Sequence, residues 1–93
     1  MTQTTQCAHF RVRGQVQGVF YRASTEATAR RLGLSGWVRN GEDGGVELVA
    51  CGPAPRLDEL EKWLWQGPAD ARVSSVERRP SPLEHFHGFE VLR

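Results

Sequence analysis

A glycine-containing segment that ends at Arg22 offers the first groups able to bind an anion. Residues 14–22 read Gly-Gln-Val-Gln-Gly-Val-Phe-Tyr-Arg and lie between a strand pattern and a helix pattern. A loop in this position can turn successive backbone N–H groups inward at the positive end of a helix. The guanidinium of Arg22 would add a planar fork for two phosphate oxygens. The segment is also typical of an ordinary turn, because glycine marks loops in general.

A second segment offers the side-chain amide of Asn40 at the end of a strand pattern. Residues 36–41 read Gly-Trp-Val-Arg-Asn-Gly. The amide can hold a water molecule in a fixed orientation, as hydrolysis requires. The pair Asn40 and Gly41 is also typical of a tight turn, because both residues tolerate positive φ. Turn rules taken alone favour this second interpretation.

Alternating apolar residues predict the strands that position these two segments. In residues 8–14, Phe10 and Val12 point to one side while Arg11 and Arg13 point to the other, which is the period of a half-buried strand. The glycine-rich stretch from residue 14 to 19 is expected to be a loop. Further strands are expected at residues 35–40, 46–51 and 71–76 and around Phe89 and Val91, whereas Pro80 and Pro82 break the chain.

Two helices are expected between these strands. In residues 22–32, Ala23 and Ala27 are spaced to form one face, and these small side chains would let the helix lie close to a sheet. Gly33 would end this helix. A second helix is expected between Pro55 and the Gly-Pro pair at residues 67–68, with an apolar face formed by three leucines, Leu57, Leu60 and Leu64.

The order β-α-β-β-α-β, with room for a short extra strand at the C-terminus, predicts an α+β fold of the ferredoxin-like type. In this split β-α-β sandwich an antiparallel sheet carries both helices on one face, and its first and third strands lie side by side. We interpret residues 1–93 as a single domain and expect the polar residues 1–6 to be frayed. Many activities share this fold, so the function must come from the two segments.

Taken together, the two segments resemble the two signature motifs of the acylphosphatase family, and the resemblance extends over nearly the whole chain. The first motif comprises Gly14, Val16, Gln17, Gly18, Val19, Tyr21 and Arg22, and the second comprises Gly36, Trp37, Val38, Arg39, Asn40, Gly44 and Val46. Their order and spacing are more specific than either motif alone. One departure is Tyr21, where many relatives have phenylalanine; its hydroxyl should be tolerated if it reaches water or a partner.

The resemblance implies a hydrolase that acts on acyl phosphates and assigns roles to named residues. Arg22 would bind the substrate phosphate, and Asn40 would position the attacking water. The phosphate cradle would be the loop formed by Gln15, Val16, Gln17, Gly18, Val19, Phe20 and Tyr21. The departing carboxylate has a conjugate acid with a pKa of about 4, so the reaction needs no general acid.

We therefore expect a metal-independent enzyme without a cofactor. No carboxylate or histidine in the motifs presents itself as a base, so we suppose that a substrate phosphate oxygen accepts the water proton. His85 and His87 have a spacing that metals can use, but no third ligand lies near them in the sequence.

Cys7 and Cys51 are the only cysteines, too few for a disulfide framework and without metal-site spacing. If the first and third strands are antiparallel neighbours, the two cysteines lie at the same end of the sheet and can form a disulfide. In a reducing cytoplasm, where we expect this protein, thiols usually stay free.

The composition weighs against macromolecular partners. A net charge of +1 gives no general field for nucleic acid or membranes, and no apolar segment is long enough to span a bilayer. We expect a cytoplasmic monomer whose partner is a small acyl phosphate. The alternative is a non-catalytic ferredoxin-like domain that binds an anion or RNA, or one that belongs to a larger maturation protein. RNA binding is disfavoured because residues 46–50 of the predicted third strand hold no aromatic residue for stacking.

Overall fold

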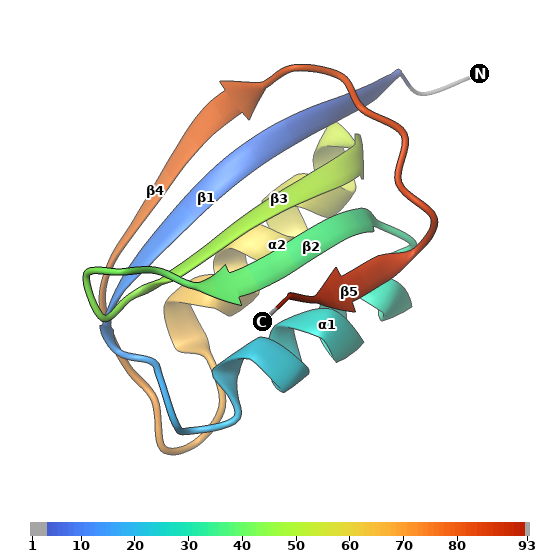
Figure 1. Cartoon of the computed structure of the whole chain (residues 1–93). Coiled ribbons are helices and arrows are strands. Elements are labelled where there is room, and N and C mark those ends of the chain that lie inside the picture. Colours follow the sequence, from blue (N-terminus) through green and yellow to red (C-terminus); the bar gives the residue numbers. More distant parts are fainter. Residues whose placement is uncertain (1–3, 93) are drawn as a thin grey trace.

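The computed structural model describes residues 4–92 as a five-stranded sheet with two helices on one face (Figure 1). Its elements are β1 (Thr5–Gln15), α1 (Tyr21–Arg31), β2 (Ser35–Asn40), β3 (Val46–Pro53), α2 (Ala54–Gln66), β4 (Arg72–Ser81) and β5 (Phe89–Val91). The strand order is β4-β1-β3-β2-β5. The predicted ferredoxin-like α+β arrangement is confirmed, with β1 and β3 antiparallel neighbours. The short β5 extends the sheet by pairing parallel to β2.

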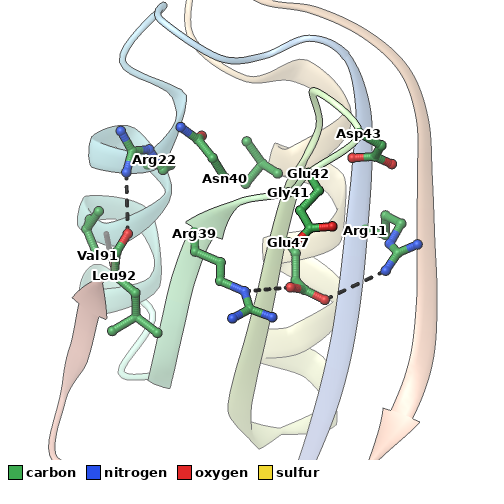
Figure 2. Close-up of a pocket in the computed structure, with 11 residues that line it drawn as sticks. Arg11, Arg22, Arg39, Asn40, Gly41, Glu42, Asp43, Glu47, Val91 and Leu92 are labelled. Carbon is green, nitrogen blue, oxygen red and sulfur yellow. Dashed lines mark hydrogen bonds and ion pairs between the residues drawn. The ribbon is translucent and has the colours of Figure 1, made fainter.

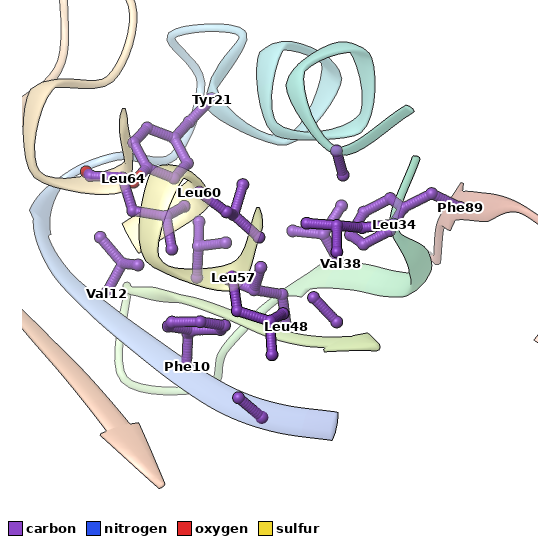
Figure 3. Close-up of a cluster of buried hydrophobic side chains, with 14 of the residues drawn as sticks. Phe10, Val12, Tyr21, Leu34, Val38, Leu48, Leu57, Leu60, Leu64 and Phe89 are labelled. Atoms are coloured by element: carbon purple, nitrogen blue, oxygen red, sulfur yellow. The ribbon is translucent and has the colours of Figure 1, made fainter. Parts of the chain in front are cut away.

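The core lies between the sheet and the helices (Figure 3). Phe10 and Val12 are fully buried, as their alternation predicted. On α2, Leu57, Leu60 and Leu64 are also fully buried, so the predicted apolar face of that helix is confirmed. Each such side chain contributes about 1.5–3 kcal/mol through its removal from water.

The predicted inner face of α1 is wrong. Ala23 and Ala27 are exposed, and the buried side chains are instead those of Tyr21, Thr25, Thr28 and Ala29. The large ring of Tyr21 sets the rotation of the helix, because it lies in the core at the first helical position. The hydroxyl of Thr25 donates to the backbone oxygen of Tyr21 at 2.8 Å, which satisfies this polar group inside the core.

β1 is longer than predicted at both ends. Thr5 and Gln6, expected to be frayed, pair with β3, while residues 1–3 lie outside the described residues. At the other end the strand continues to Gln15 after an irregularity between Arg13 and Gly14. Gly14 has φ 129, and a Cβ there would collide with the carbonyl oxygen of Arg72. Glycine therefore allows the strand to continue rather than ending it.

β4 also exceeds the prediction, since it runs through Pro80 to Ser81. Among the strands of residues 4–92, it is hydrogen-bonded to β1 alone. Proline is tolerated in an edge strand because one side of that strand needs no backbone donor.

The other face of the sheet carries a small second cluster. Cys7 and Cys51 lie opposite each other on β1 and β3, with Cα atoms 4.0 Å apart, and form a disulfide. Val49 packs beside them, and Trp37 and Phe86 cover the cluster. The segment after β4 thus folds back over this face before the chain enters β5.

Candidate active site

The two sequence motifs meet at one end of the sheet. The loop between β1 and α1 lies against the turn between β2 and β3 (Figure 1). The side chain of Gln17 joins them, because its Nε2 donates to the carbonyl oxygens of Gly41 at 3.1 Å and Gly45 at 2.7 Å. Segments about two dozen residues apart in the sequence are therefore held as one unit.

The backbone of the first loop has an unusual conformation. Gly18 has φ 75 and Phe20 has φ 62, so both occupy the left-handed region. Alternation between right-handed and left-handed residues makes successive N–H groups converge on a concavity that suits anions. Phe20 is the only non-glycine residue with positive φ among residues 4–92. Such backbone outliers concentrate at functional sites.

Two side chains of this loop are buried in the core. Val16 is buried in the core. Tyr21 is also buried, and its hydroxyl donates to the backbone oxygen of Leu64 at 2.6 Å, so the added hydroxyl has found a partner. Burial raises the pKa of the Tyr21 phenol, which therefore stays neutral. These residues can contact a phosphate only through their backbone, while the side chain of Phe20 is 82% exposed.

Arg22 lies in the first turn of α1, where the helix presents its positive end. Its Nη1 donates weakly to the backbone oxygen of Leu92 at 3.4 Å. None of the ion pairs formed within residues 4–92 includes this guanidinium. The charge of Arg22 is therefore available to an anion from outside the chain.

Asn40 is the last residue of β2 and is exposed. The neighbouring β5 pairs with β2 only as far as Val38, so Asn40 lies beyond the end of its outer neighbour. Asn40 and Arg22 line the same open cleft, which has a volume of about 990 Å³ (Figure 2). The lining residues are Arg11, Arg22, Arg39, Asn40, Gly41, Glu42, Asp43, Val46, Glu47, Val91 and Leu92.

The structure thus brings the two predicted catalytic residues together. Among the described residues, the predicted cradle at residues 15–21 does not itself line this cleft. It adjoins the cleft through the bond from Gln17 to the lining residue Gly41.

The turn between β2 and β3 is held by its own hydrogen bond. The Asp43 carboxylate accepts the N–H of Gly45 at 3.0 Å and lies 3.7 Å from the guanidinium of Arg13. The bond from Gly45 lowers the pKa of Asp43, and the charge of Arg13 lowers it further. Asp43 is thus an ionised group that shapes the turn next to Asn40.

A row of charges that the sequence did not predict runs across the sheet. Glu47 stands opposite Arg11 on one side and Arg39 on the other. Its carboxylate accepts from Arg39 Nε at 2.6 Å, contacts His9 Nε2 at 2.7 Å and lies 3.8 Å from Arg11. Burial alone would raise the pKa of Glu47, but the bonds from His9 and Arg39 outweigh it and lower the pKa. Only the strand register reveals this row.

Residues 4–92 contain no group of three or more His, Cys, Asp and Glu side chains that could hold a metal ion. No helix within that part of the chain has the length and apolar character needed to cross a membrane.

This protein belongs to a class of small ferredoxin-like proteins, with an amide at one end of the sheet beside an arginine that forms no ion pair within residues 4–92. Comparison with known proteins narrows this class. The acylphosphatase family model matches residues 8–91. An acylphosphatase from Vibrio cholerae is 49% identical over 88 residues, which is 94% of this chain and 97% of that protein. One from Xanthomonas euvesicatoria pv. vesicatoria is 59% identical over 84 residues, covering 87% and 96%.

A solved structure gives the same result. The structure of an acylphosphatase from Coxiella burnetii superposes with a TM-score of 0.93 at 44% identity, covering 99% of this chain and 100% of that one. The chain belongs to the acylphosphatase family. Membership makes it an enzyme whose substrate is an acyl phosphate.

Proposed function

We propose that Arg22 and the backbone of residues 15–21 bind the phosphoryl group of an acyl phosphate while Asn40 orients the attacking water. The observation that carries this assignment is that Arg22, which has no carboxylate partner within residues 4–92, faces the same cleft as Asn40. The two residues come from α1 and β2, which are elements of a packed scaffold.

The reaction needs little beyond positioning. The water oxygen forms a bond to phosphorus as the bond from phosphorus to the acyl oxygen breaks, and the electron pair leaves with the carboxylate. Arg22 and the loop N–H groups offset the charge on the phosphoryl oxygens. The side-chain amide of Asn40 aligns the water with the breaking bond. The water proton passes to a phosphoryl oxygen, so no protein base is required.

Metal independence follows from the leaving group. A carboxylate departs as a stable anion, whereas an alkyl phosphate must expel an alkoxide, which calls for a general acid or a metal. We expect hydrolysis of benzoyl phosphate in excess EDTA and negligible hydrolysis of an alkyl phosphate. Comparable turnover of the two substrates, or loss of activity with EDTA, would contradict this mechanism.

We further propose that one chain suffices for activity, because Arg22, Asn40 and the loop all belong to the same chain. Sedimentation of the active enzyme at assay concentration should give the mass of a single chain of 10.4 kDa. Activity found only in a larger species would show that the single chain is not the active form.

A further inference from the structure

We propose that Arg39 recognises a second anionic group on the acyl portion of the substrate. The preferred substrates would then be acyl phosphates whose acyl group carries a carboxylate or a phosphate. This inference rests on the proposed function, because it assumes that the phosphoryl group lies at Arg22.

The shape of the cleft indicates where the acyl group goes. A cleft of about 990 Å³ is far larger than a phosphoryl group needs, and its volume is that of a site for a whole small molecule. Arg22 and Asn40 occupy one part of it. The remainder extends over the sheet, where Figure 2 shows Arg39, Glu47 and Arg11 in a row across β2, β3 and β1. A substrate bound at Arg22 has this surface available for its acyl group.

The guanidinium of Arg39 is fixed in place but only partly used. Its Nε donates to Glu47 at 2.6 Å, and its Cζ lies 5.0 Å from the centre of the Trp37 ring. No hydrogen bond within residues 4–92 involves its two terminal nitrogens. The side chain is 52% exposed. A guanidinium held in this way offers a preorganised fork to a carboxylate or phosphate.

Arginines and acids line the cleft in equal number, but two of the three acids are already engaged by other groups. Glu47 is shared between two arginines, Arg39 and Arg11, and contacts His9 as well. Asp43, another acidic lining residue, accepts a hydrogen bond from the Gly45 N–H and forms an ion pair with Arg13. Glu42 is the remaining acid of the cleft and forms no ion pair within residues 4–92. The Glu42 carboxylate would repel an anionic acyl group. Removal of Glu42 should therefore raise the preference for anionic substrates, whereas removal of Arg39 should lower it.

The test compares benzoyl phosphate with its 3-carboxy and 4-carboxy derivatives, which have nearly the same shape but one more charge. The readout is the ratio of kcat/KM for a carboxylated substrate to that for benzoyl phosphate. We expect the wild-type ratio to exceed one and Arg39→Gln to lower it about tenfold, the loss of one charge-assisted hydrogen bond. The change should lie mainly in KM, because the contact already exists in the bound substrate.

Three further variants sharpen the result. Arg39→Lys should keep part of the preference, because it retains the charge without the fork. Glu42→Gln should raise the ratio about twofold to threefold, as expected for an exposed charge. Arg31→Gln removes the same charge from an exposed position on α1 and should leave the ratio unchanged.

A measurement on the wild-type protein guards against a variant that does not fold. Raising the ionic strength should reduce the wild-type ratio, because the contact is partly exposed. An Arg39→Gln enzyme that kept the wild-type ratio, or a wild-type ratio of one at low salt, would overturn the inference while leaving the proposed function intact. If the wild-type enzyme hydrolysed none of the three substrates, the proposed function itself would fail.

Discussion

At the scale of single residues, Arg22 and Asn40 share a cleft but should affect the reaction differently. In the proposed mechanism, Arg22 meets the phosphoryl charge both in the bound substrate and in the transition state. Asn40 is proposed to contact the water, which matters chiefly during the reaction. This difference separates a binding effect from a rate effect.

Substitution of Arg22 should weaken binding and turnover together. We expect Arg22→Gln to raise both KM and the inhibition constant of inorganic phosphate and to lower kcat, because a charge contact to the phosphoryl group is lost. Arg22→Lys should restore only part of the activity, because a point charge cannot reproduce the fork. Steady-state kinetics with benzoyl phosphate and competition by phosphate measure both effects. Unchanged phosphate inhibition in Arg22→Gln would remove Arg22 from the phosphate site.

Asn40→Ala should instead lower kcat by about 10²-fold or more, by analogy with the loss of one oriented donor. KM and phosphate inhibition should change little, since Asn40 is proposed to hold the water and not the phosphoryl group. The same kinetic measurements apply, with the inhibition constant of phosphate as the internal control. Turnover close to that of the wild type would refute the role given to Asn40.

At the scale of elements, the bonds of Gln17 to Gly41 and Gly45 hold the two active-site segments together. Gln17→Leu removes these donors while keeping the volume of the side chain. We expect about tenfold lower kcat/KM, because misplacement of a reacting group by about 1 Å is costly. Gln66→Leu is a matched control, since Gln66 is exposed at the end of α2 and no side-chain hydrogen bond of Gln66 occurs within residues 4–92. Equal effects of the two substitutions would argue against the bridge.

The contact between α1 and α2 gives a stability prediction. Tyr21→Phe removes the hydroxyl that bonds to the Leu64 carbonyl oxygen at 2.6 Å in the buried interior. The free energy of unfolding should fall by about 1–2 kcal/mol, because a buried acceptor loses its partner. Urea unfolding measures the difference, and benzoyl phosphate turnover should stay near the wild-type value. A variant as stable as the wild type would show that the Leu64 carbonyl finds another donor.

At the scale of the whole molecule, the disulfide between Cys7 and Cys51 joins the two central strands over a sequence separation of 44. In the chain-entropy model, closing a loop of this length stabilises the fold by about 4 kcal/mol. A reducing agent should therefore lower the urea midpoint of the oxidised protein. It should not affect a variant that combines Cys7→Ser with Cys51→Ser. The same midpoint with and without reductant would mean that the bond contributes nothing to stability.

Local features could be predicted from the sequence alone. Alternation along residues 8–14 and the leucine spacing of α2 depend on the period of one element, so the sheet and its helical cover could be predicted. Arg22 and Asn40 could also be predicted from the sequence, because each of the two motifs lies at the junction of two predicted elements.

Features that depend on residues distant in the sequence became visible only in the folded chain. Pro80 ends no strand because β4 lies at an edge, and an edge position cannot be inferred from residues 71–81 alone. The inner face of α1 follows from the burial of Tyr21 against α2 rather than from its small alanines. The row of Arg11, Glu47 and Arg39 exists only through the register of three strands, because charges that interact across a sheet leave no periodic signal in any one of them.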